Sequence, residues 1–192
     1  PQGVLAVVGK PDVSRESFAR SIAGSRACCH GGQKKGACRE SGNVVVLDRL
    51  QDPGNIGTII RTADAAGYGG IVLLKGTADI FSPKVIRAAA GSVFRMPIFF
   101  AEDPQEVLAL MKECGKKTAA TCFDTENYYY QTDITKDTAL IIGNEGNGIC
   151  REFTESADIK VKIPMYGNIE SLNAAVAAAI LMYEAVREKG EM

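Results

Sequence analysis

Amide, carboxylate, hydroxyl and guanidinium side chains gather in three short segments of this sequence. The first is Asp52–Arg61, the second is Gly143–Gly148, and the third is Ser171–Asn173. A guanidinium near the end of a strand can hold a phosphate or polarise a hydroxyl group. A glycine-rich turn exposes main chain against which a ligand can lie. The three segments can form one site only if the fold brings them together.

The glycine-rich segment follows a run of apolar β-formers, Ala139–Ile142, so a buried strand is expected to open there into a loop. The loop does not match the dinucleotide-binding fingerprint, because no helix with phosphate-facing amides clearly follows it. It also lacks the Gly-Lys-Ser/Thr ending of a Walker loop. A tight turn that needs positive φ angles remains the alternative to a ligand site.

A second strand and a helix are expected close to this loop. The strand, Ile159–Ile163, is stopped by Pro164, and Ser171 can cap an alanine-rich helix that runs to about Lys189. Open α/β sheets bind ligands in the crevice at the carboxyl ends of their strands. We therefore predict that the two strand ends and the start of the helix converge on one crevice.

The first segment predicts a helix over about residues 55–66, with Asn55 as its N-cap and an apolar face at helical spacing. Arg61 lies outside that apolar face, which suits a role in holding a phosphate or a hydroxyl group. The alternative is an ordinary surface arginine paired with Asp64 or Asp48. The structure can decide between these two interpretations.

The remaining sequence alternates between strand and helix patterns. Strands are predicted at about 3–8, 43–48, 70–74, 96–100 and 117–122, and helices at 82–90 and 104–114, with a helical turn near 14–23. The continuous β-branched run at 44–47 is typical of a central strand covered on both faces. This β-α-β-α order predicts an α/β fold with a mostly parallel sheet and helices on both faces.

Composition is that of a soluble globular protein. The chain has 192 residues, 46% of them hydrophobic and 23% charged, which favours one main domain. No run is apolar enough to span a bilayer and no signal peptide is recognisable, so we expect a cytoplasmic protein without membrane partners. The net charge of −1 argues against binding nucleic acid by bulk electrostatics alone. A basic, flexible insertion over about residues 10–42 is either an RNA-contacting flap or a solvated loop.

The six cysteines show no regular disulfide spacing, and free thiols are expected. Cys28, Cys29, His30 and Cys38 lie close together in the sequence, but they lack the Cys-x2-Cys spacing of a zinc knuckle. We therefore expect no metal. The segment Tyr128–Tyr130 is aromatic enough to stack a nucleic-acid base, although packing beneath a loop is the commoner role of such residues.

The three polar segments, together with Ile163–Met165, resemble the motifs of the SpoU (TrmH) family of RNA 2′-O-ribose methyltransferases in the SPOUT superfamily. The resemblance covers nearly the whole chain. It implies a deep C-terminal trefoil knot, a homodimer and S-adenosylmethionine as cofactor. It also implies methylation of a ribose 2′-OH in RNA, rRNA more than tRNA. Under this interpretation residues 1–192 are the catalytic domain, and the L30e-like RNA-binding domain that often precedes it is absent.

Site residues are carried over from the family's motifs by position. The catalytic set would be Asn55, Arg61, Glu145, Ser171 and Asn173. Cofactor contacts would fall on Gly143, Asn144, Ile163, Met165, Leu172 and Asn173. The resemblance leaves open whether Arg61 accepts the proton of the 2′-OH or only clamps phosphate and hydroxyl, and a guanidinium is a poor base at neutral pH. A non-catalytic RNA-binding or ribosome-assembly module is the alternative. The target nucleotide, and whether its methylation is housekeeping or confers antibiotic resistance, also stay open.

Overall fold

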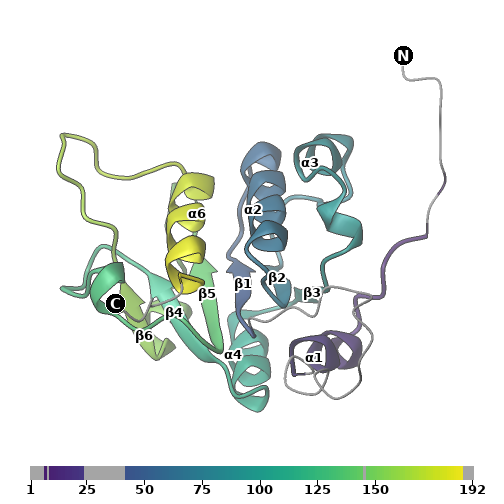
Figure 1. Ribbon diagram of the computed structural model, residues 1–192, viewed down its shortest axis with the longest axis horizontal. Coiled ribbons are helices and arrows are strands. Elements are labelled where there is room, and N and C mark those ends of the chain that lie inside the picture. The colour runs from purple at the N-terminus through teal and green to yellow at the C-terminus, as the bar shows by residue number, and fades with distance from the viewer. Residues whose placement is uncertain (1–6, 8, 24–41, 145, 188–192) are drawn as a thin grey trace.

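The computed structural model describes residues 7, 9–23, 42–144 and 146–187 of the chain. They form a single sheet with helices packed against both of its faces (Figure 1). In chain order the elements are α1 (Arg15–Ala23), β1 (Val44–Leu47), α2 (Pro53–Ala65), β2 (Gly70–Leu74), α3 (Pro83–Ala88), η2 (Ser92–Phe94), β3 (Ile98–Ala101), α4 (Pro104–Glu113), β4 (Lys117–Thr121), η3 (Tyr129–Gln131), β5 (Thr138–Ile142), α5 (Arg151–Ser156), β6 (Ile159–Val161) and α6 (Ala174–Ala185).

The sheet has six strands in the order β3-β2-β1-β5-β4-β6, and every neighbouring pair is parallel. Strand β1 lies in the middle, where Val45 pairs with Ile71 on one side and with Leu140 on the other. All four residues of β1 are buried, because helices cover both faces of the strand. The prediction of a central strand in a mostly parallel sheet is confirmed.

Two separate hydrophobic clusters fill the space between the sheet and its helices. One packs alternate strand residues such as Leu47 and Leu140 against α2, α3 and α6. The other packs the intervening residues, such as Val46 and Ile141, against α1, α4 and α5. Figure 1 shows α2, α3 and α6 on one side of the sheet, with α1 and α4 on the opposite side. Successive side chains along each strand therefore point alternately into the hydrophobic cluster on one face of the sheet and into the cluster on the other face.

The order of the strands places a switch point between β1 and β5. From β1 the chain adds β2 and then β3 on one side, and it builds β5, β4 and β6 on the other. In an open parallel sheet the loops that leave such neighbouring strands diverge and leave a crevice at the carboxyl edge. The loops that follow β1 and β5 contain the first and second polar segments of the sequence.

Two helices begin at residues other than those predicted. Helix α2 is capped by Asp52, whose carboxylate accepts a hydrogen bond from the backbone N–H of Asn55 at 2.8 Å, and Pro53 opens the first turn. Helix α6 is capped by Asn173 instead of Ser171, and it ends at Ala185 instead of Lys189. In both cases a second capping residue stands two or three positions away, and the sequence alone did not rank them.

Other differences concern the boundaries of elements. Strand β6 ends at Val161, two residues before the predicted Ile163. The predicted helical turn in the basic segment is a full helix, α1, which buries Phe18 and Ile22. The strand predicted at 3–8 falls almost entirely outside the described residues, and its one described member, Val7, is exposed. Among the described helices, none combines the length and the hydrophobicity needed to cross a membrane.

Candidate active site

The loops that follow β1 and β5 are bonded directly to each other. The backbone N–H of Asp48 donates to the carbonyl of Ile142 at 2.9 Å, which extends the strand pairing by one residue. Beyond that point the side-chain Nδ2 of Asn144 donates to the carbonyl of Arg49 at 2.9 Å. The loop that leads from β1 into the first polar segment therefore meets the second polar segment at the switch point of the sheet.

A buried carboxylate fixes this junction. Asp48 is 0% exposed, and its two oxygens accept hydrogen bonds from the guanidinium of Arg49, at 2.6 and 3.3 Å, and from the backbone N–H of Cys150, at 2.6 Å. Arg49 adopts φ = 56°, a conformation that is costly for a residue with a side chain. The hydrogen bond to Asp48 raises the pKa of Arg49. Asp48 thus holds both its own loop and the far end of the glycine loop.

The glycine loop is closed by one asparagine and requires one glycine. Asn144 pairs with Gly148 through two backbone hydrogen bonds, and its Oδ1 accepts from the backbone N–H groups of Gly146 and Asn147. A Cβ on Gly143 would lie 2.3 Å from the carbonyl carbon of Gly148, so no side chain fits there. The alternative of a turn that needs positive φ applies to Gly148, at 65°, but the close approach at Gly143 is a separate requirement.

The first and third polar segments meet through two asparagines. Asn173 Oδ1 accepts from the backbone N–H groups of Ala175 and Val176, so its Nδ2 must point the other way. This Nδ2 donates to Asn55 Oδ1 at 2.9 Å. The capping bonds at the start of α6 therefore fix the orientation of the Asn55 amide, whose donor end faces away from Asn173.

Arg61 projects from α2 as an exposed side chain. The alternative interpretation, an arginine paired with Asp64 or Asp48, is wrong: Asp64 accepts from Arg95 at 2.7 Å, and Asp48 is engaged as described above. Within the described part of the chain, the side chain of Arg61 forms no ion pair or hydrogen bond. Asn55, which the motifs place in the same catalytic set, accepts a hydrogen bond from Asn173, and no hydrogen bond between the side chains of Asn55 and Arg61 is found in the described structure.

The glycine of the first segment has a packing role. A Cβ on Gly57 would lie 2.4 Å from the Cβ of Ala88 and 2.9 Å from the carbonyl of Val85. Gly57 therefore lets α2 and α3 approach closely, and this contact fixes how α2 presents its outer side. The sequence placed Gly57 beside Arg61 without predicting this packing contact.

Residues 163–172, here called the open segment, connect β6 to α6 without regular structure. Ile163, Met165 and Leu172 are half-buried, whereas Ser171 is exposed. Strand β6, which leads to the open segment, is separated by β4 alone from β5, which leads to Gly143; at about 4.8 Å per strand the two strands lie about 10 Å apart. Within the described part of the chain, the backbone N–H and C=O groups of the open segment make no hydrogen bonds. Free backbone groups beside apolar side chains suit the edge and ring of a nucleoside.

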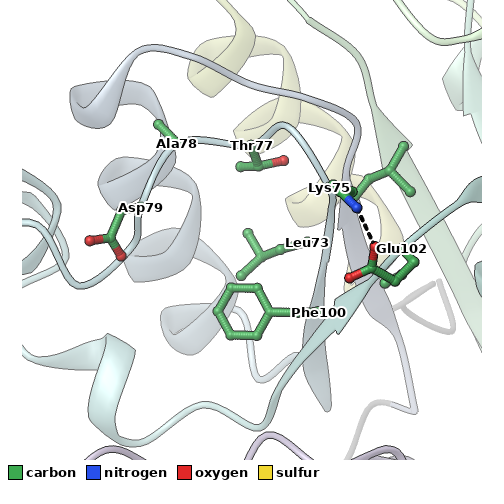
Figure 2. A pocket seen from close by; sticks show the side chains of 9 residues that line it. Leu73, Lys75, Thr77, Ala78, Asp79, Phe100 and Glu102 are labelled. Atoms are coloured by element: carbon green, nitrogen blue, oxygen red, sulfur yellow. Dashed lines mark hydrogen bonds and ion pairs between the residues drawn. The ribbon is translucent and has the colours of Figure 1, made fainter.

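A shallow pocket lies at the carboxyl ends of β2 and β3, on the other side of β1 from the open segment (Figure 2). It has a volume of about 180 Å³ and includes Leu73, Thr77, Phe100 and the ion pair of Lys75 with Glu102. The loop that follows β2 touches the loop that follows β1, through the 2.9 Å hydrogen bond from Ala78 N–H to the Leu50 carbonyl. None of the predicted site residues lines this pocket.

Three residues of the junction were missed by the motifs: Asp48, Arg49 and Cys150. The available signal was a carboxylate placed directly after four apolar strand residues, because an acid buried at a strand end needs partners. Burial raises the pKa of the Cys150 thiol to about 11, so the thiol is protonated at neutral pH and serves through its backbone. The described cysteines, Cys114, Cys122 and Cys150, are free thiols, as predicted.

Two predictions fall outside the described residues. Glu145 lies within the glycine loop but is not described, and the cluster of Cys28, Cys29, His30 and Cys38 is not described either. Among the residues that are described, no group of histidine, cysteine and acidic side chains is arranged to hold a metal ion.

Comparison with known proteins decides the family. Residues 42–183, which include all of the site described above, match the model of the SpoU rRNA Methylase family. The chain belongs to this family. The six-stranded parallel sheet with helices on both faces is thus the α/β fold of a SpoU methylase, as the resemblance of the three motifs implied.

Individual relatives agree with this SpoU assignment. The chain is 44% identical over 157 residues to the 23S rRNA (guanosine(2553)-2′-O)-methyltransferase RlmP of Bacillus subtilis (strain 168), a match that covers 82% of this chain and 62% of that protein. The SpoU methyltransferase AviRb from Streptomyces viridochromogenes has a similar structure, with a TM-score of 0.73 and 37% identity. The match covers 77% of this chain and 59% of that chain. An AdoMet-bound rRNA methyltransferase from Sinorhizobium meliloti gives a TM-score of 0.71 and 41% identity. The match covers 74% of this chain and 55% of that chain. The chain thus spans about three fifths of the length of the curated relatives it matches.

Proposed function

We propose that this chain is the catalytic domain of an S-adenosylmethionine-dependent methyltransferase that methylates a ribose 2′-OH in RNA, with rRNA as the favoured substrate. The observation that carries the proposal is the hydrogen bond between Asn55 and Asn173, which joins the first and third SpoU motifs at one edge of the sheet. The printed activity of the B. subtilis relative and the cofactor bound to the S. meliloti structure support the reaction and the cofactor.

The cofactor's place is proposed at the carboxyl edge, between the glycine loop and the open segment. Gly143, Asn144 and the backbone of Ile163, Met165 and Leu172 would hold it. The open segment combines unpaired backbone groups with half-buried apolar side chains, and Gly143 allows close approach to the main chain of the loop. The bound cofactor supplies a sulfonium methyl group, which needs no metal and no covalent enzyme intermediate. The protein must then align a weak oxygen nucleophile with that methyl group and stabilise the loss of its proton.

The catalytic roles follow from side-chain chemistry. Arg61 would clamp the RNA phosphate and stabilise the developing alkoxide, since its guanidinium has no partner among the described residues. Asn55 presents an amide whose orientation is fixed by Asn173. Ser171, exposed just before α6, would bind phosphate close to the start of that helix. Glu145 would order the glycine loop and a subunit contact.

A homodimer is part of the proposal. The outer side of α6 exposes Val176 (49%) and Tyr183 (53%), two large side chains seven residues apart and therefore on one face of the helix. A second copy that packs against α2 and α6 would cover them and could bring a partner's arginine to the site. The C-terminal trefoil knot and a cytoplasmic location, where the proposed RNA substrate is found, belong to the same proposal.

Three measurements test this proposal. Titration calorimetry with S-adenosylmethionine should detect binding, and total RNA incubated with labelled cofactor should yield a 2′-O-methylated nucleoside on digestion. Sedimentation should show a dimer. Cofactor binding without transfer to any RNA would favour the alternative of an RNA-binding or ribosome-assembly module, and absence of both would overturn the proposal.

A further inference from the structure

Four tyrosines gather beside the open segment. The rings of Tyr128 and Tyr130 are stacked, with centroids 5.6 Å apart and planes at 5°, and Tyr129 meets Tyr130 edge to face at 5.2 Å. The ammonium of Lys162 lies 5.2 Å from the centroid of Tyr128. A cation, a ring and a second ring thus form a continuous stack. Desolvation is the largest cause of the raised pKa of Tyr130, and the neighbouring phenol of Tyr166 adds to it.

These tyrosines divide into packing and exposed members. Tyr129 is partly buried against the hydrophobic cluster beneath α6, so it has the packing role expected of an aromatic residue below a loop. Tyr130 keeps 45% of its surface exposed, and Tyr166 keeps 90%. Stacking on Tyr128 already restricts the conformation of the Tyr130 side chain, so binding of a ligand would cost little further conformational entropy. Tyr130 is therefore a preorganised surface for another flat ring.

The aromatic surface is joined to the proposed active site by the backbone. Tyr129 N–H donates to the carbonyl of Lys162 at 3.1 Å, and Lys162 N–H donates to the carbonyl of Asn127 at 3.0 Å. Lys162 immediately precedes Ile163, where the open segment begins, and Tyr166 is part of that segment. A group bound at Tyr130 would thus lie against the same segment that is proposed to hold the cofactor.

We propose that Tyr130, with Tyr166 beside it, stacks an unpaired base of the substrate RNA next to the nucleotide that is methylated. This inference rests on the proposed function. Sequence-tolerant stacking on tyrosine is a general way to hold single-stranded RNA. It also suits a chain with a net charge of −1, because stacking on an aromatic ring does not depend on bulk electrostatic attraction to phosphates. The Lys162 ammonium, shared between Tyr128 and Glu126, supplies only a local cation.

The chain contains no tryptophan, so a single introduced one reports on this surface alone. In Tyr130→Trp, a short single-stranded RNA oligonucleotide should quench the fluorescence, and the same oligonucleotide with abasic positions should not. Phe94→Trp, at an aromatic residue of η2 that is 42% exposed, is the matched control and should not respond to the bases. In Tyr130→Ala, affinity for the oligonucleotide should fall about tenfold, whereas Tyr130→Phe should stay within about twofold of wild type.

Other outcomes would overturn the inference. Equal quenching by intact and abasic RNA, or unchanged RNA affinity in Tyr130→Ala, would show that no base stacks there. Conversion of a wild-type dimer into a monomer by Tyr130→Ala would show that the surface contacts a second copy instead. The proposed function is tested separately by methyl transfer in the wild-type chain. If RNA binding depends on Tyr130 but no methyl group is transferred, the stacking surface stands and the catalytic proposal fails.

Discussion

The two halves of the carboxyl edge are held in different ways. Around the switch point, Asp48 and Asn144 together take part in hydrogen bonds that link the loops after β1 and β5 into one unit. The backbone of the open segment, in contrast, forms no hydrogen bond within the described part of the chain. One half is built before any ligand arrives, and the other keeps its backbone groups available.

This difference separates positioning from binding. Preorganised groups lose no reorganisation energy when charge develops on a reacting atom, so a rigid junction suits the residues that align the substrate. Unpaired backbone groups can gain hydrogen bonds from a ligand, so the open segment suits recognition of the cofactor. Substitutions in the two halves should accordingly affect different measurements.

Arg61 belongs to neither half, and its substitution should have the largest effect on the rate of methyl transfer. Because its guanidinium makes no internal bond among the described residues, Arg61→Ala should leave the melting temperature unchanged. Methyl transfer should fall by about 10²- to 10³-fold, as expected when a group that stabilises developing charge is removed. Single-turnover transfer measures this loss, and calorimetry should find cofactor affinity within about tenfold of wild type.

Arg61→Lys is the matched control, since it keeps the charge but loses the planar fork that binds phosphate and hydroxyl together. Its transfer rate should lie between those of the wild type and Arg61→Ala. A loss of cofactor affinity as large as the loss of transfer would place Arg61 in the cofactor site instead.

Within the rigid half, substitution of Asp48 should cause the largest loss of unfolding free energy. Asp48→Ala leaves the partly buried N–H of Cys150 without its acceptor and releases the strained Arg49, which should cost about 2–3 kcal/mol of unfolding free energy. Arg49 is 42% exposed in its side chain and can turn to water, so the full cost of an unpaired buried charge is not expected. Urea unfolding gives this value directly.

Glu102→Ala is the corresponding control, because Glu102 pairs with Lys75 at the surface and should contribute no more than about 0.5 kcal/mol. Asp48→Asn retains one acceptor oxygen and should fall between the two. Equal stability of Asp48→Ala and wild type would mean that the junction is not rigid, and the contrast between the halves would be lost.

Within the glycine loop, two glycines allow a paired test. Gly143→Ala would force its Cβ against the backbone of Gly148, so the loop must shift, at a cost of about 1–2 kcal/mol. Gly146→Ala meets its nearest atom, Asn144 Oδ1, at 3.5 Å and should be tolerated. Calorimetry should therefore show weaker cofactor binding for the first variant alone. Similar affinities in the two variants would show that close backbone contact at Gly143 is not needed.

The architecture could be predicted from sequence because each element carried a local signal. The β-branched run at Val44–Leu47 indicated a doubly covered strand, and Pro104 after Asp103 marked the start of α4. Helix starts were less certain where two capping residues competed, as with Asp52 and Asn55. Such competition is decided by which backbone N–H each side chain reaches, and the sequence does not contain that geometry.

The site could be located from sequence but not assembled from it. The motifs placed Asn55 and Asn173 in one region, whereas the hydrogen bond between them depends on how α2 and α6 pack across 118 residues of sequence. Asp48 was overlooked because its importance comes from the burial that β5 and the glycine loop impose on it. Partner choice among buried polar groups is a property of the tertiary structure.

The link between the halves is Asn173, whose two functions can be separated by substitution. Asn173→Asp keeps an acceptor for the N–H groups of Ala175 and Val176, but it cannot donate to Asn55 Oδ1. Stability should therefore stay within a few tenths of a kcal/mol, because Asp caps a helix as well as Asn. The Asn55 amide would turn to donate toward the new carboxylate, so its donor end would no longer face away from α6. Transfer should fall about tenfold, equivalent to about 1.4 kcal/mol.

Asn173→Ala removes both functions and should lose about 1 kcal/mol of stability in addition, which for a chain of this size lowers the melting temperature by about 2–4 °C. Melting curves and single-turnover rates measured on both variants separate the cap from the amide relay. If Asn173→Asp transfers methyl groups at the wild-type rate, the orientation of Asn55 is irrelevant to the reaction. The cap alone would then explain why an asparagine stands at this position, and the two halves would be joined only by the packing of α2 on α6.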